Sequence, residues 1–171
     1  YYSVHLDETN IDVSLTVSER SGIHNYTFPS GSDQVVVLDL VHRDIVLDSK
    51  LDIIDKSLIT GYRFSRSWAQ DQRLFYDILF SRPYIDVVVE DNLNAGESVR
   101  AAFIFDSVES NELEVRVGIS AVDQKGALQN RKHELDGRSF EDVLQIAEST
   151  WEQQLNKIVV ETYNEEDKFN F

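Results

Sequence analysis

The chain has 171 residues, 42% of them hydrophobic and 27% charged, and its 16 Lys and Arg against 31 Asp and Glu give a net charge of −15. This length supplies enough apolar surface for one self-sufficient domain, and the acidity argues against nucleic acid as a partner because phosphates require a basic surface. The absence of cysteine excludes disulfides, a thiol nucleophile, Cys-ligated zinc and iron–sulfur clusters. No apolar run reaches the roughly 18 residues of a membrane-spanning helix.

The first two thirds of the chain alternate apolar and polar residues, which places every second side chain on one face of a sheet. The alternation is clearest at residues 11–17 and 113–119. Further apolar runs are separated by turn-forming clusters and lie at residues 2–6, 24–28, 35–38, 58–64, 74–80, 85–89 and 101–105. About ten strands with no helix between them predict a mostly antiparallel, all-β sandwich.

Two of these runs, residues 35–40 and 84–89, are apolar on both faces of the predicted strand. Such runs are typical of strands that are covered on both sides. We therefore expect either a large sandwich or a second structural element over one of its outer faces.

After Ser120 the apolar period changes from two to between three and four. Asp123 can cap a short helix that runs to about His133, and Ser139 with Asp142 predicts a capping box ahead of a longer helix. That helix carries one apolar stripe, made of Phe140, Val143, Leu144, Ala147, Trp151, Leu155 and Ile158. Residues 158–160 return to an extended pattern. We expect a β-domain over residues 1–120 and a helical linker over 121–171.

The chain contains no methionine and begins directly on a strand pattern. We interpret it as a segment of a longer polypeptide, so that the lack of a signal peptide carries no information on secretion.

The four histidines are His5, His24, His42 and His133, and none has the spacing of a paired metal ligand. No calcium loop, nucleophile elbow or glycine-rich phosphate loop is present either. We expect a solvated strand face around His5 and a hydrogen-bonded, half-buried side chain at His24. The residues themselves thus predict no metal site and no catalytic residue within this chain.

Residues 61–72 interleave aromatic side chains with Arg63, Arg66 and Gln72 around Trp68. This mixture is typical of surfaces that stack on sugar rings and grip polar groups. The alternative is structural, with Trp68 as a core or domain-interface anchor and the arginines paired with carboxylates. A second polar cluster, residues 39–44 with His42, follows a predicted strand and forms either a site rim or an interface.

These segments together resemble the N-terminal domain of glycoside hydrolase family 92. The resemblance lies in order in residues 1–4, in the strand pair 18–29, in Asp39-Leu40 followed by His42, in residues 61–65 with Trp68-Ala69 and Gln72, and in Phe80-Ser81-Arg82-Pro83-Tyr84. It continues through residues 117–120, Ala127, Asn130, Glu134, Trp151 and Leu155. It covers nearly the whole chain.

The resemblance implies an exo-acting α-mannosidase, commonly of the α-1,2 type, that inverts configuration with the help of calcium. It also implies a β-supersandwich of the galactose mutarotase-like kind, joined by helices to an (α/α)₆ catalytic barrel that this chain lacks. In the family the acid, the base and most calcium ligands belong to that barrel, so this segment is expected to wall the cleft and to bind no calcium itself. The implied partners are α-linked mannose glycans and the C-terminal catalytic domain. The implied setting is a bacterial protein that is periplasmic, cell-surface or secreted.

Two other classes of function are compatible with the residues. A stand-alone carbohydrate-binding or adhesion module would use the same aromatic β-surface without chemistry. A mutarotase-like epimerase would require a histidine and a carboxylate in one cleft, for which His5 and Glu90 are the conceivable pair.

Overall fold

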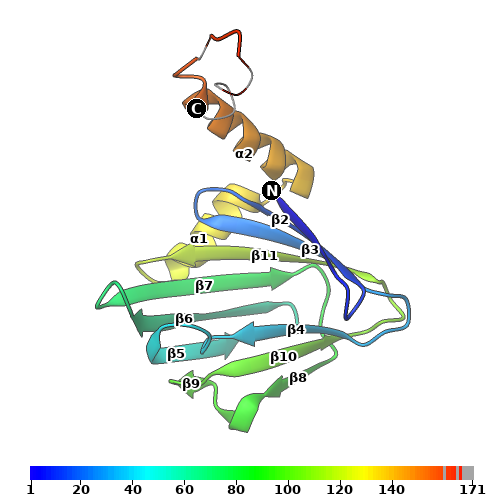
Figure 1. Cartoon of the computed structure of the whole chain (residues 1–171). Helices are drawn as coiled ribbons and strands as arrows, with labels where there is room; N and C mark the ends of the chain where they lie inside the picture. The colour runs from blue at the N-terminus through cyan, green and yellow to red at the C-terminus, as the bar shows by residue number, and fades with distance from the viewer. Residues whose placement is uncertain (160, 165, 167–171) are drawn as a thin grey trace.

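The computed structural model describes residues 1–159, 161–164 and 166, which fold into two antiparallel sheets followed by two helices (Figure 1). The larger sheet has eight strands in the order β1-β2-β3-β11-β7-β6-β5-β9. In chain order these strands are β1 (Tyr2–Leu6), β2 (Ile11–Val17), β3 (Ser21–Thr27), β5 (Ile45–Ile53), β6 (Leu58–Arg66), β7 (Gln72–Phe80), β9 (Ala95–Gly96) and β11 (Glu112–Ser120).

The smaller sheet packs on one face of the larger sheet, which we call the inner face. It has the order β4-β10-β8, with β4 (Gln34–Asp39), β10 (Arg100–Phe105) and β8 (Asp86–Val89), and a short 3₁₀ helix, Glu90–Asn92, follows β8. The core between the sheets comprises Phe28, Leu40, Leu51, Ile59, Tyr76, Phe80, Tyr84, Val99, Ala101, Phe103, Phe105, Leu113 and Val115. The large antiparallel sandwich predicted from the alternation is confirmed.

Both predicted helix starts are confirmed by their caps. Helix α1 (Gln124–Leu135) begins after Asp123, whose carboxylate accepts a hydrogen bond from the Gly126 N–H at 2.6 Å. Helix α2 (Phe140–Leu155) begins with the full capping box, in which Ser139 and Asp142 each accept from the other's backbone N–H.

Helix α1 lies on the outer face of the larger sheet, over β11 and β7. It approaches so closely that a Cβ added at Gly118 of β11 would sit 2.4 Å from the Ala127 carbonyl oxygen. An ion pair between Asp77 of β7 and Arg131 of α1 lies under the helix, with both side chains 4% exposed. These contacts hold α1 firmly against the larger sheet.

Helix α2 packs through its first half only. Phe140 and Val143 are buried against Ile23 and Leu135, whereas Trp151 and Leu155 are both 67% exposed. The helix contacts β2 and then runs past the sheet (Figure 1), so Trp151 and Leu155 in the second half of the predicted apolar stripe stay largely exposed. Residues 158 and 159 lie in no strand, contrary to the predicted extended segment, and residue 160 falls outside the described residues.

The expectation that residues 35–40 and 84–89 are covered on both sides is wrong for the described part of the chain. Val35, Val37, Ile85 and Val88 are all exposed, because these side chains point away from the core and no described element lies over that face of the smaller sheet. Both faces of these strands are apolar, and the described residues cover one of them.

Candidate functional site

Arg63 organises one end of the sandwich, where the loop between β4 and β5 passes the inner face of β6. Its Nε donates to the Leu40 carbonyl at 2.8 Å, and its Nη2 donates to the carbonyls of His42 and Arg43 at 3.1 and 2.6 Å. Nη1 donates to Ser65 Oγ at 3.0 Å. Four donor contacts from a group with five N–H bonds leave little capacity for a ligand. Arg63 is thus a clamp on loop 40–44 rather than a free sugar-gripping group.

The clamped loop has an unusual backbone. Arg43 and Asp44 have φ values of 58° and 54°, so that two consecutive residues other than glycine occupy the left-handed region. Such conformations cost on the order of 1–3 kcal/mol each and persist where the surroundings hold them. The three carbonyl contacts of Arg63, together with its 3.9 Å approach to the Asp44 carboxylate, hold this loop.

Asp39 links the same loop to the smaller sheet. Its Oδ1 accepts from the N–H groups of Val41 and His42 at 2.7 and 3.1 Å and from Arg100 Nε at 3.2 Å. Arg100 in turn pairs with Glu90 at 2.9 Å. Partial burial alone would raise the pKa of Asp39, but these hydrogen bonds and Arg100 outweigh it and hold the pKa below its usual value.

The remaining residues singled out from the sequence lie at this same end. Trp68 is 98% exposed in the turn between β6 and β7, with Arg66 and Gln72 exposed on either side of it. Pairing of Arg66 with Ile45 at the start of β5 brings this turn next to loop 40–44 and His42. We call this surface, formed by loop 40–44 and residues 66–72, the loop-end surface. The structure therefore brings His42, Arg63, Arg66, Trp68 and Gln72 together at this end of the sandwich. Whether Trp68 stacks on a sugar or anchors an interface stays a prediction.

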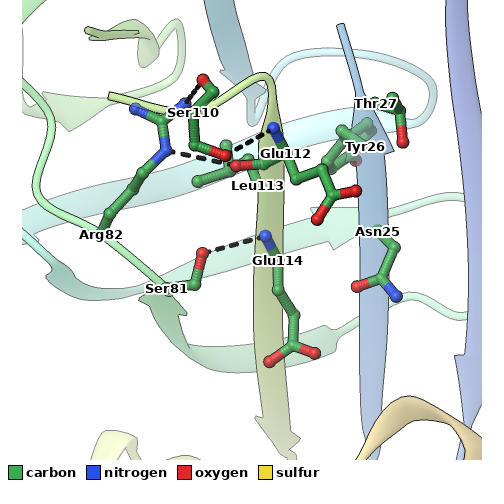
Figure 2. Close-up of a pocket in the computed structure, with 9 residues that line it drawn as sticks. All are labelled: Asn25, Tyr26, Thr27, Ser81, Arg82, Ser110, Glu112, Leu113 and Glu114. Atoms are coloured by element: carbon green, nitrogen blue, oxygen red, sulfur yellow. Dashed lines mark hydrogen bonds between the residues drawn. The ribbon is translucent and has the colours of Figure 1, made fainter. Parts of the chain in front are cut away.

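A shallow hollow lies where β3 ends and β11 begins, at the end of the sandwich opposite the loop-end surface (Figure 2). The sequence did not predict this hollow. Arg82 borders it and donates to the carbonyls of Asp106, Ser110 and Glu112 at 2.9, 3.2 and 3.3 Å, while it lies over the Phe105 ring. It also bonds to Gln34. Nothing in the sequence indicated that the Arg82 guanidinium ties the connection between β10 and β11 to the start of β4. Its contacts are structural.

Glu134 makes a second set of contacts that the spacing of residues in the sequence could not predict. Its Oε2 accepts from Ser18 Oγ at 2.5 Å and from the Arg20 N–H at 2.9 Å, and its Oε1 accepts from Arg20 Nε at 2.9 Å. Burial opposes ionisation, but these three donors prevail and lower the pKa of Glu134. The carboxylate thereby fastens α1 to the turn between β2 and β3, across more than 110 residues of sequence.

The two histidines discussed from the strand pattern behave as expected. His5 is exposed and its Nδ1 lies 2.8 Å from Asp12. His24 is half-buried, with its Nδ1 3.0 Å from the Tyr26 hydroxyl. The epimerase pairing of His5 with Glu90 is not formed, because Glu90 lies beyond the smaller sheet and pairs with Arg100.

The described residues bring no three His, Cys, Asp or Glu side chains together in a way that could hold a metal ion. The resemblance places most calcium ligands in the catalytic barrel, and the described residues offer no cluster of their own for the ion. Among the described helices, none is both long and apolar enough to cross a membrane.

Comparison with known proteins identifies relatives of this chain. Residues 1–120 match the model of the glycosyl hydrolase family 92 N-terminal domain. The family GH92 alpha-mannosidase BT3965 from Bacteroides thetaiotaomicron superposes with a TM-score of 0.84 at 26% identity, over 94% of this chain and 24% of that chain. The GH92 inverting mannosidase BT2199 from Bacteroides thetaiotaomicron VPI-5482 superposes with a TM-score of 0.79 at 21% identity, over 94% of this chain and 22% of that chain. A search among curated proteins found no match. The chain thus spans less than a quarter of the length of either mannosidase.

Proposed function

Because this chain belongs to the glycosyl hydrolase family 92 N-terminal domain family, we propose that it is the non-catalytic N-terminal domain of an exo-acting α-mannosidase. The observation that carries the proposal is the family match over residues 1–120, joined to the superposition on an alpha-mannosidase over 94% of the chain. The substrates we propose are glycans with terminal α-linked mannose.

The carboxylates of this chain support a non-catalytic role. An inverting glycosidase uses a general acid of raised pKa and a second carboxylate about 6.5–9.5 Å away that activates water. Hydrogen-bond donors lower the pKa of the carboxyl groups of Asp39, Asp52, Glu134 and Asp142. A carboxyl group stabilised as its anion is a poor proton donor. We place the acid and base in a catalytic domain of the same polypeptide, as the family resemblance implies.

The loop-end surface is our candidate for the part of this domain that walls the substrate cleft. Arg63 and Asp39 hold its backbone in one conformation, while Trp68, Arg66 and Gln72 extend from it into solvent. A surface with a rigid base and exposed aromatic and polar groups suits contact with a second domain or with a sugar.

In this proposal the calcium ion is bound by the catalytic domain. Since no described side chains form a cluster that could hold the ion, we place its ligands outside them and assign no step to it here. Export to the periplasm, the cell surface or the medium, in a bacterial source, stays a prediction from the family.

The test is mannose release from a set of α-mannosides by the whole polypeptide and by residues 1–171. We expect release by the whole polypeptide and none by the segment. A whole polypeptide that is inert on every α-mannoside would contradict the proposed parent activity, and release by the segment would contradict its non-catalytic role. Sugar binding by the segment in calorimetry, combined with an inert whole polypeptide, would instead favour the carbohydrate-binding module, for which the exposed Trp68 is the specific observation.

A further inference from the structure

The hollow of Figure 2 lies on the outer face of the larger sheet, beside the part of that face that the helices cover. Helix α1 approaches Gly118 near the end of β11, and Ile23 of β3 is buried against α2. Further along the same two strands, the hollow has a volume of about 430 Å³. This volume is within the range of sites that bind small ligands.

Four polar side chains form a square on the floor of the hollow. In the antiparallel pairing of β3 with β11, Thr27 lies opposite Glu112 and Asn25 lies opposite Glu114. All four point to the outer face, because the side chains that alternate with them pack against the core. Opposite residues in such a pair have Cβ atoms about 4.5–5.5 Å apart, and residues two apart on one strand are separated by about 6.5–7 Å. One small ligand can therefore contact all four side chains.

Much of the hydrogen-bonding capacity of this square is unused. Among the described residues, none bonds to the side chains of Asn25, Thr27 or Glu112. Ser81 at the rim accepts the Glu114 N–H at 3.0 Å, so that its own O–H can still donate. The hollow thus offers an amide, two hydroxyls and free carboxylate oxygens to a ligand.

The backbone around the hollow is already held in place. Both β3 and β11 have a paired strand on each side. Arg82 donates to the carbonyls of Ser110 and Glu112 at 3.2 and 3.3 Å, and the Glu112 N–H donates to Ser110 Oγ at 3.0 Å. A ligand therefore meets polar groups on a fixed frame, which lowers the ordering cost of binding.

The charges around the hollow favour a neutral ligand. Glu114 pairs with Arg116 at 2.7 Å, and the Arg82 guanidinium lies against the Glu112 carbonyl. Two guanidinium groups thus balance the two carboxylates, so the described residues here carry no net charge that would concentrate a free cation or anion. Carboxylate oxygens accept hydrogen bonds, whereas an amide both donates and accepts. The ligand that fits is uncharged and carries several hydroxyl groups.

We propose that this hollow is a saccharide-binding site, separate from the loop-end surface and at the opposite end of the sandwich. Sugar hydroxyls donate to Glu112 and Glu114, and the Asn25 amide and the Thr27 hydroxyl complete the contacts. Binding is weak, with half-saturation on the order of 1 mM, because the Tyr26 ring packs against the core and offers no stacking surface. Such a site raises the local concentration of a glycan at this domain, whatever chemistry another domain performs.

Methyl NMR of the whole polypeptide, labelled in its threonine methyl groups, tests the site directly. The variants Thr27→Ser and Thr60→Ser identify the two signals that are compared, and the probes are the methyl α-glycosides of mannose, glucose and galactose. We expect at least one glycoside to shift the Thr27 signal saturably and to leave the Thr60 signal unchanged, since the Thr60 hydroxyl bonds to the Tyr76 carbonyl on other strands. A Thr27 signal that no glycoside moves, at concentrations well above the expected half-saturation, would overturn the proposal.

Substitutions at the hollow give a second measurement by the same titration. Asn25→Ala and Glu112→Ala each remove hydrogen-bonding groups from the ligand and should raise the half-saturation concentration about tenfold. Glu109→Ala removes an exposed carboxylate of the connection between β10 and β11 that does not line the hollow, and it should titrate like the wild type. If Asn25→Ala and Glu112→Ala also titrate like the wild type, the sugar binds elsewhere and the proposal is wrong.

Two further results separate this proposal from its alternatives. A Thr27 signal that shifts with calcium chloride and with none of the glycosides would identify a cation site and overturn the saccharide proposal. A Thr27 signal that shifts with a glycoside, in a polypeptide that releases no mannose, would support this site while contradicting the mannosidase proposal. The two proposals therefore fail independently.

Discussion

Gly118 is the residue whose missing side chain matters most to the docking of α1. A Cβ there would lie 2.4 Å from the Ala127 carbonyl oxygen and 2.8 Å from the Arg131 nitrogen, and neither backbone atom can move alone. We expect Gly118→Ala to lower the free energy of unfolding by about 1–3 kcal/mol, as overpacking does. Urea unfolding followed by circular dichroism measures this. Gly22→Ala, whose nearest contact would be 3.2 Å, is the control and should cost less; equal losses would contradict the role of close helix approach.

Trp68 is 98% exposed at the loop-end surface, and we predict that it is an anchor for the proposed catalytic domain. In the whole enzyme, Trp68→Ala should lower the melting temperature through a loss of about 2–4 kcal/mol of interdomain packing, with kcat/KM unchanged. Differential scanning calorimetry and steady-state kinetics measure the two. A fall in kcat/KM at an unchanged melting temperature would instead identify a sugar-stacking platform, and no change in either would exclude both roles. Val108→Ala, which truncates a 91% exposed side chain outside the loop-end surface, is the control.

Hydrogen bonds from arginine side chains to backbone carbonyls could not be predicted from the sequence. The sequence places Arg63 in a polar cluster, and the structure confirms that it lies beside residues 40–44. Its partners, however, are the backbone carbonyls of residues 40, 42 and 43, and no side-chain pattern marks a carbonyl. Arg82 escaped notice for the same reason. A clamp of this kind is visible only when the chain is folded.

At the scale of elements, the ion pair between Asp77 and Arg131 joins β7 to α1. Both side chains are 4% exposed, so removing one partner leaves a buried, uncompensated charge. We expect Arg131→Ala to cost about 3–5 kcal/mol of unfolding free energy, and the double variant Asp77→Leu/Arg131→Met to recover most of that loss. Chemical denaturation of both variants and of the exposed control Lys132→Ala tests this. A double variant as unstable as Arg131→Ala would contradict the electrostatic explanation.

The contact of Glu134 with Ser18 and Arg20 predicts a pH dependence. Because folding lowers the pKa of Glu134, the unfolded chain binds more protons, and stability rises with pH through the interval below the unfolded pKa. The stabilisation is fully present above about pH 5 and is lost as pH falls through the folded pKa. Glu134→Gln should therefore flatten the loss of stability in acid, measured by urea unfolding at several pH values. A curve parallel to that of the wild type, as expected for the exposed control Glu141→Gln, would contradict this.

The elements that sequence predicted well are those specified by local chemistry. The capping residues Asp123 and Ser139 act within three residues, so their positions fix where α1 and α2 begin. The apolar stripe of α2 is also set by local residue spacing. The segment that covers the stripe is set by the tertiary structure instead. Whether Trp151 is buried depends on where the helix leaves the sheet, and the pattern contains no information on that.

At the scale of the whole molecule, period-two alternation was sufficient for the sandwich because each strand needs one buried face. The unequal sizes of its sheets, eight strands against three, could not be predicted, since alternation does not specify pairing partners. The sequence identified the residues of the candidate site but not their chemical role. Its residues gather at one end of the sandwich, and the acid and base that a glycosidase needs are placed by our proposal in another domain.

The most direct test of this account is proton NMR of an α-mannoside incubated with the whole polypeptide. It reports in one experiment whether the substrate is consumed, whether the sugar released is mannose, and which anomer forms first. We predict loss of the α-linked anomeric signal and first appearance of β-mannose, as inversion requires. An α-mannoside signal that stays intact with a folded polypeptide would contradict the account.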